Sequence, residues 1–300
     1  MSQIALLGAL EIGLVYGLVA LGVLLSFRVL SFPDLTVDGS FPLGAAVAAS
    51  AIVAGIDPYL TTLLAIVAGA AAGLITAILN VRFNILHLLA SILTMIALFS
   101  INLRIMGRPN IALITAPTML SPFEAMGLAN PVLKPLFVGL IVLAVAALLA
   151  RFLLSDYGLG MRATGANPRM ARAQGIATGR TICVGMALSN AMVALAGALF
   201  AQTNGFADIT IGTGTIVVGL AAVIVGETIL PARRIGLVVL ACVLGSILYR
   251  IAVALALNAD VLGLEASDLN LVTALLVGLA LILPGARNPV KALVARRAQA

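Results

Sequence analysis

The side chains that could carry out chemistry are few in this sequence, and they do not form a catalytic set. His87 is the only histidine, and the two cysteines, Cys183 and Cys242, both lie inside apolar runs. Nucleophilic triads need a histidine beside the nucleophile, and a zinc site needs clustered cysteine or histidine ligands. Neither of the two lysines follows the glycine-rich turn of a phosphate-binding loop. The sequence therefore indicates a protein that is not an enzyme, with no metal site, no cofactor and no ATP-binding motif of its own.

A small set of acidic and hydroxyl residues does fall inside or beside long apolar runs. They are Glu11, Asp34, Thr36, Asp38, Asp208 and Thr210. An ionised side chain at mid-bilayer costs about 2.5–3.5 kcal/mol even on the lenient scale, so we expect these residues to line or gate a path. The alternative is helix capping or interhelical hydrogen bonding, which would also suit Asn102, Asn190 and Gln202.

The longest polar interruption of the chain, residues 155–180, contains the pattern of one short helix. Asn167 is a favoured N-cap, Pro168 fits the first helical position, and Gly175 supplies the left-handed residue that ends a helix. A helix of about two turns is not stable alone in water, so we expect a partner protein to pack on it. The basic residues of this region are Arg151, Arg162, Arg169, Arg172 and Arg180.

The elements that position these residues are membrane-spanning helices. Hydrophobic residues make up 62% of the 300 and charged residues 9%, mean hydropathy is +1.21, and several runs reach the roughly 20 residues that span a bilayer. We expect an all-α, polytopic membrane protein with one transmembrane domain, 1–286, and a basic cytoplasmic tail, 287–300. The second of about nine (8–10) spans is short enough to be broken or re-entrant. The expected spans are 4–27, 41–56, 60–79, 88–106, 136–153, 181–200, 214–230, 236–256 and 269–284.

The basic residues predict how these spans are oriented. If residues 155–180 are cytoplasmic, only Arg104, Arg108, Lys134 and Arg250 fall outside, and the other thirteen of the 17 basic residues lie inside. By the positive-inside rule, the N-terminus is then outside and the C-terminus inside. The net charge of +6 therefore reflects orientation rather than nucleic-acid binding. On the inner face, Glu227 is expected to pair with the nearby pair of arginines, residues 233–234.

Two stretches of similar sequence suggest an internal repeat. Residues 32–37 and 206–211 both read Phe-x-Asp-aliphatic-Thr-aliphatic, and each is followed by a glycine-containing turn and a small-residue helix. Five spans separate the copies, and an odd number inverts the second copy relative to the first. The repeat halves would be about 1–154 and 181–286, which is a transporter arrangement. Generic helix-start chemistry is the alternative explanation.

The outer segment 107–135 is the longest loop expected outside the membrane. Its prolines argue against a single continuous helix. It could receive a partner protein on the outer side, or it could be a lid without partners.

The region from Gly158 to Ile176 carries the pattern G-x-x-x-R-A-x-G-x-N-x-x-x-A-x-x-x-G-I. This pattern resembles the cytoplasmic coupling segment of bacterial ABC importer permeases of the branched-chain amino acid and ribose type, and the resemblance covers nearly the whole chain. The wording FPDLTVDGSFPLGAAVAAS, residues 32–50, resembles a tryptophan/tyrosine-type subgroup. Ribose-type members carry an additional N-terminal span that this sequence lacks. The residues that the resemblance assigns to ATPase coupling are Gly160, Arg162, Gly165, Asn167, Pro168, Ala171, Gly175 and Ile176.

The resemblance implies the membrane-spanning permease subunit of an ATP-driven importer in the bacterial inner membrane. Its implied partners are two ATP-binding subunits, a second permease chain that is identical or paralogous, and an extracytoplasmic solute-binding protein. The implied cargo is an amino acid, with aromatic ones among the candidates, or another small polar solute. The alternative is a stand-alone secondary transporter driven by an ion gradient, for which Glu11 is the one plausible acid at membrane depth.

Overall fold

The structure is a computed structural model that describes residues 3–122, 132–231, 234–257, 275 and 278. Within these residues, six helices are long and apolar enough to cross a membrane, which confirms a helical polytopic architecture. The first of them, α1, continues into a π-helix, η1. The six are α1 (Gln3–Val23) with η1 (Leu24–Val29), α3 (Pro58–Phe83), α4 (His87–Met106), α6 (Leu133–Leu154), α9 (Thr178–Asn204) and α11 (Ile235–Leu257).

Two further apolar helices are too short to cross a bilayer alone. Helix α2 (Val37–Val53) has 17 residues and α10 (Thr215–Ile229) has 15, against the roughly 20 needed for a full span. They correspond to the expected second and seventh spans. The expected ninth span, 269–284, lies outside the described residues except for residues 275 and 278, so a count of nine stays a prediction.

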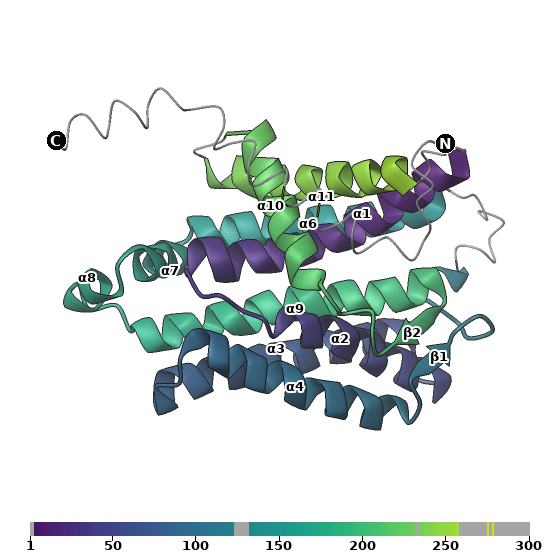
Figure 1. Ribbon diagram of the computed structural model, residues 1–300, viewed down its shortest axis with the longest axis horizontal. Helices are drawn as coiled ribbons and strands as arrows, with labels where there is room; N and C mark the ends of the chain where they lie inside the picture. The colour runs from purple at the N-terminus through teal and green to yellow at the C-terminus, as the bar shows by residue number, and fades with distance from the viewer. Residues whose placement is uncertain (1–2, 123–131, 232–233, 258–274, 276–277, 279–300) are drawn as a thin grey trace.

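Helix α9 lies at the centre of the bundle. Figure 1 shows it between a group formed by α1, α6, α10 and α11 and a second group formed by α2, α3 and α4. Glycines allow its backbone to approach both α2 and α3, because a Cβ at Gly44 would overlap the Ala194 backbone and one at Gly73 would overlap the Met186 carbonyl. Close packing through small residues is the usual way in which helices associate inside membranes.

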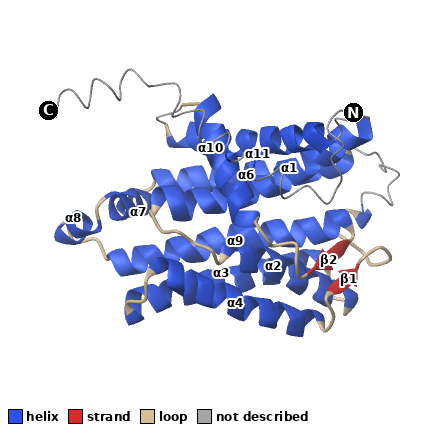
Figure 2. Ribbon diagram, in the orientation of Figure 1, coloured by secondary structure: helices blue, strands red, loops and turns tan. Residues whose placement is uncertain are grey.

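The all-α prediction needs one correction, which is a small sheet at one end of the bundle. Strand β1 (Asn110–Ala112), from the proline-rich loop, pairs antiparallel with β2 (Phe206–Asp208), which follows α9. Figure 2 shows this sheet in red beside the end of α9, at the end of the bundle opposite α7 and α8. The pairing joins segments almost a hundred residues apart, so no local sequence pattern predicts it.

A second correction concerns the polar segment 155–180, for which the sequence predicts one helix. The structure has two there, α7 (Asp156–Ala166) and α8 (Pro168–Ala173). Helix α7 was missed because its three glycines lower helix propensity, whereas the Ser155 hydroxyl that caps it accepts a hydrogen bond from Gly158 N at 3.3 Å.

Candidate functional site

The helix α8 has the two ends that the sequence predicts for it. The Asn167 side-chain oxygen accepts hydrogen bonds from the backbone N–H groups of Arg169 and Met170, both at 3.1 Å, and Pro168 occupies the first helical position. Gly175 has φ +82°, and the N–H groups of Gly175 and Ile176 donate to the carbonyls of Arg172 and Ala171, both at 3.0 Å. This pair of bonds is a Schellman motif. The six-residue helix is therefore closed at both termini by its own sequence.

Helix α7 holds α8 away from the membrane bundle and is itself docked through a glycine. A Cβ at Gly165 would overlap the Val29 carbonyl at the end of η1, so only a glycine allows this approach. Met161, one turn earlier, is fully buried, and its side chain reaches towards Gly185 of α9. Helix α7 thus contacts both the first and the central helix of the bundle.

Most of α8 is exposed. Pro168, Arg169, Met170 and Arg172 face solvent, and only Ala171 is buried. Ile176, which follows the helix, lies 3.8 Å from the position of a Cβ on Gly160, so the exit of α8 packs over α7. Figure 1 shows the pair projecting beyond the ends of the long helices. Such a short, exposed and rigid helix is suited to contact with a partner protein rather than to catalysis.

Another predicted coupling residue, Arg162, behaves differently. Its Nε atom is buried and has no hydrogen-bond partner among the described residues. The side chain lines a groove between α6 and α11 together with Arg234, rather than the exposed face of α8.

A buried polar network lies where the chain passes from η1 into α2. The side chain of Asn190, on α9, donates to Asp34 Oδ2 at 2.8 Å, and its oxygen accepts from the Ser40 hydroxyl at 2.7 Å. Asp34 Oδ1 accepts the Thr36 N–H at 2.9 Å, and the hydroxyls of Thr36 and Thr76 lie 2.8 Å apart. All five side chains are buried. The network therefore ties α2, α3 and α9 together inside the bundle.

Asp38 makes the next connection, to the other short helix. Its carboxylate accepts hydrogen bonds from Gly214 N at 3.3 Å and Ile216 N at 2.8 Å, the first amides of α10. Unpaired amides at a helix start carry partial positive charge, which a carboxylate stabilises. A Cβ at Gly212 would overlap the Asp38 carbonyl, so the starts of α2 and α10 are in direct contact.

The second copy of the repeated sequence, residues 206–211, adopts the same local turn but is less buried than the first. Asp208 Oδ1 accepts from Thr210 N at 2.7 Å, as Asp34 does from Thr36 N. Asp208, however, lies in β2 near the surface, and Asn110 of β1 donates to it at 3.2 Å. Burial raises the pKa of Asp208, but hydrogen bonds from Thr210 and Asn110 lower it by more, so its pKa lies below the ordinary value.

Glu11 is not brought to the buried network. Its carboxylate interacts with the Thr203 side chain and lies near Lys134, whose Nζ donates to the Thr203 carbonyl at 3.1 Å. Thr203 is at the end of α9 and Lys134 at the start of α6, so Glu11 belongs to the end of the bundle that carries the sheet.

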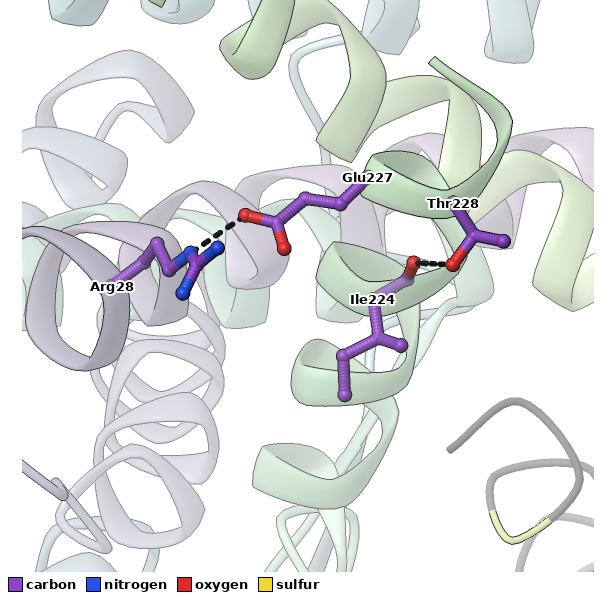
Figure 3. Close-up of polar contacts among 4 residues, drawn as sticks. All are labelled: Arg28, Ile224, Glu227 and Thr228. Carbon is purple, nitrogen blue, oxygen red and sulfur yellow. Dashed lines mark hydrogen bonds and ion pairs between the residues drawn. The ribbon is translucent and has the colours of Figure 1, made fainter. Parts of the chain in front are cut away.

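Glu227 pairs with an arginine far away in the sequence, while residue 233 of the predicted pair lies outside the described residues. In Figure 3, Arg28 of η1 and Glu227 of α10 point towards each other, and Arg28 Nε lies 2.7 Å from Glu227 Oε1. Thr228, beside Glu227, instead donates to the Ile224 carbonyl of its own helix at 2.7 Å. The ion pair joins the end of the first span to the end of α10.

Sequence reasoning missed several members of the buried network. Ser40 and Thr76 were not candidates because hydroxyl residues are common in small-residue helices and carry no distinctive spacing. Asn190 was noted only as an amide at membrane depth, and its partner could not be read from a sequence in which Asp34 is 156 residues away.

Comparison with known proteins agrees with this picture. A family model described as branched-chain amino acid transport system / permease component matches residues 5–284. A tyrosine transport system permease protein of Clostridioides difficile (strain R20291) is 36% identical over 265 residues, 88% of this chain and 86% of that protein. An uncharacterized protein of Rickettsia prowazekii (strain Madrid E) is 36% identical over 204 residues, 68% of this chain and 70% of that one. The solved structure of PsaBC from Streptococcus pneumoniae in complex with Fab has the same fold, with a TM-score of 0.53 at 15% identity, and the match covers 93% of this chain and 90% of that one.

Proposed function

Because the chain belongs to the permease components of branched-chain amino acid transport systems, it is the multi-pass inner-membrane permease of an ABC importer, and we propose that residues 155–180 couple it to the ATP-binding subunit. The family membership confirms the function that the resemblance predicts and favours it over an ion-driven carrier.

The observation that carries the coupling proposal is the exposed, doubly capped helix α8 on its docked support α7. Closure of two ATP-binding subunits around ATP would move the grooves in which α8 of each permease chain sits. Helix α7 would pass that motion on through Gly165 to the end of η1 and through Met161 to α9. The assembly would contain two permease chains, two ATP-binding subunits and a solute-binding protein on the other side.

We further propose that the chain carries an inverted repeat with its N-terminus outside and its C-terminus inside. Two observations support this: α1 begins at the end of the bundle opposite α7 and α8, and the short helices α2 and α10 meet start to start. In a variant without Cys183 and Cys242, Ser2→Cys should react with an impermeant thiol reagent in intact cells and Ala298→Cys should not. The reverse labelling would overturn this orientation.

The proposed cargo is an aromatic amino acid such as tyrosine. Its support is the 36% identity, over 88% of this chain, to a protein described as a tyrosine transport system permease. The residues proposed to line or gate the path are Asp34, Thr36 and Asp38, with Asp208, Thr210 and Glu11 towards the outer end.

Co-purification of the ATP-binding subunit tests the coupling proposal. Met170, 47% exposed on α8, is the natural position to change, and Met170→Ser should weaken retention of the ATP-binding subunit. The matched control is Leu86→Ser, which alters a 76% exposed apolar side chain in the α3–α4 connection and should leave retention unchanged. Equal retention by both variants would remove α8 from the interface.

A further inference from the structure

An apolar groove runs between α6 and α11, on a side of the bundle distant from the polar network. It has a volume of about 740 Å³, and its walls include Leu143, Ala147 and Leu154 of α6 and Leu237 and Leu240 of α11. Leu143, Leu154, Leu237 and Leu240 are each at least 44% exposed, so the groove opens outwards. In a membrane-spanning bundle, an apolar opening of this kind is suited to lipid acyl chains.

One end of this groove is basic, because Arg162 of α7 and Arg234 beside the start of α11 both line it. The buried Arg162 Nε has no hydrogen-bond partner, and the one ion pair found among the described residues, Arg28–Glu227, involves neither arginine. The first amides of α11, at Ile235 and Gly236, have no acceptor within their own helix, and the space beside Gly236 is open. Two cations and a helix start thus converge at a place where the described lining residues include no acidic side chain.

We propose that this groove binds an anionic phospholipid, with the headgroup phosphate at Arg162 and Arg234 and an acyl chain along α6. Basic pockets between membrane helices on the cytoplasmic side favour such headgroups. The length of the groove agrees with a lipid tail, since residues 143–154 of α6 rise about 16 Å, close to the roughly 15 Å of hydrocarbon in one leaflet. A free anion would leave the apolar walls unfilled.

The position of Arg162 gives the lipid a structural role. Arg162 belongs to α7, the helix that supports α8, and it lies one residue after Met161, which is packed into the bundle. A phosphate bound by Arg162 would hold α7 against the membrane surface. This inference depends on the membrane placement of the chain and not on which protein binds α8.

Native mass spectrometry of the permease, purified with its ATP-binding subunit from membranes containing phosphatidylglycerol, tests the site. The wild type should retain phosphatidylglycerol, and Arg234→Gln and Ala147→Phe should lose most of it. The first change removes a headgroup contact, and the second fills the groove. Arg151→Gln, at the exposed end of α6, and Ala144→Phe, exposed on α6 outside the groove, are matched controls and should retain the lipid.

A second measurement separates a lipid from a simple anion. After delipidation, vesicles of phosphatidylglycerol should raise the melting temperature of the wild type but not of Ala147→Phe, whereas phosphatidylcholine vesicles and inorganic phosphate should not raise it. Full lipid retention by Arg234→Gln and Ala147→Phe would overturn the proposal. So would equal loss from the two controls, or equal protection by inorganic phosphate.

Discussion

Asp38 in the first turn of α2 accepts a hydrogen bond, at 2.8 Å, from the backbone N–H of Ile216 in the first turn of α10. One carboxylate therefore caps a helix that starts almost 180 residues further along the chain. Neither short helix could begin inside a membrane with its amides unpaired, because no water is available there to satisfy them. The contact satisfies the first amides of α10, while Asp34 accepts the Thr36 N–H at the start of α2.

Removal of this cap should damage transport more than removal of an equivalent cap elsewhere. Asp38→Ala should destabilise the protein by about 1–2 kcal/mol through loss of the cap, and uptake should fall because the starts of α2 and α10 separate. The control is Asp57→Ala, since Asp57 caps α3 through Tyr59 N and Leu60 N at the surface. Thermal unfolding in detergent and uptake by proteoliposomes should show similar destabilisation but lost uptake only for Asp38→Ala. Normal uptake by Asp38→Ala would contradict a role for this contact in the path.

The left-handed residue after α8 allows a sharp test of coupling. Gly175→Val places a β-branched residue at φ +82°, a strain of about 1–2 kcal/mol, which a six-residue helix cannot absorb. Membrane levels should stay near normal, while retention of the ATP-binding subunit and ATP-driven uptake should fall. Asn167→Ala should act more mildly, through a cap worth about 1 kcal/mol.

Gly55→Val is the matched control for this strain. Gly55 has φ +86°, follows α2, and, like Gly175, has open space where a Cβ would be. Gly55→Val should lower the stability of the protein by a similar amount without releasing the ATP-binding subunit. If Gly175→Val retains that subunit and its solute-stimulated hydrolysis, residues 155–180 are not the coupling segment.

Two glycines of α7 should respond in opposite ways to the same substitution. Gly165→Ala would bring a Cβ into the Val29 carbonyl and should cost about 1–3 kcal/mol, since the backbones must separate. Gly160→Ala meets only the Ile176 side chain at 3.8 Å and should be neutral or stabilising, because alanine is the better helix former. Melting temperatures compare the two directly, and equal values would rule out the close approach of α7 to η1.

The buried network predicts strong coupling between Asp34 and Asn190. Asp34→Ala leaves the Thr36 N–H and the Asn190 amide without this acceptor, at about 1–3 kcal/mol for a buried group left unsatisfied. A double-mutant cycle with Asn190→Ala should therefore give an interaction energy of about 0.5–3 kcal/mol. Uptake should be impaired while the ATP-binding subunit is retained. Additive effects would show that the two side chains act separately.

Asp208→Ala is the comparison for the same turn near the surface. It should change stability by no more than about 0.5 kcal/mol and impair uptake less than Asp34→Ala does. Because the pKa of Asp208 lies below its ordinary value of 3.8, its charged form stabilises the fold above that pH. That contribution is lost as the pH falls through the lowered pKa. Acid unfolding of Asp208→Ala should therefore depend less on pH below about 4 than that of the wild type.

The features that sequence could predict are those set by neighbouring residues. Asn167, Pro168 and Gly175 determine the ends of α8 through contacts within five residues, and the structure has all of them. Apolar length alone predicted the six helices that are long enough to cross a membrane. The Asn190–Asp34 and Arg28–Glu227 contacts depend on how distant helices pack, which residue types alone do not determine. The glycines of α7 argue against a helix by their low helix propensity. In the structure Gly165 instead allows the close approach of α7 to Val29.

The short connection between η1 and α2 has a mechanical consequence. Val29, against which Gly165 packs, is only five residues before Asp34, so fully extended chain could bridge at most about 17 Å between them. The connection is also held in place, since Phe32 is buried and its N–H donates to the Ser26 carbonyl at 2.9 Å. A connection this short, with its middle residue hydrogen-bonded, limits how far η1 and Asp34 can move apart. A displacement of η1 by α7 would therefore be passed on to the carboxylate in the middle of the bundle.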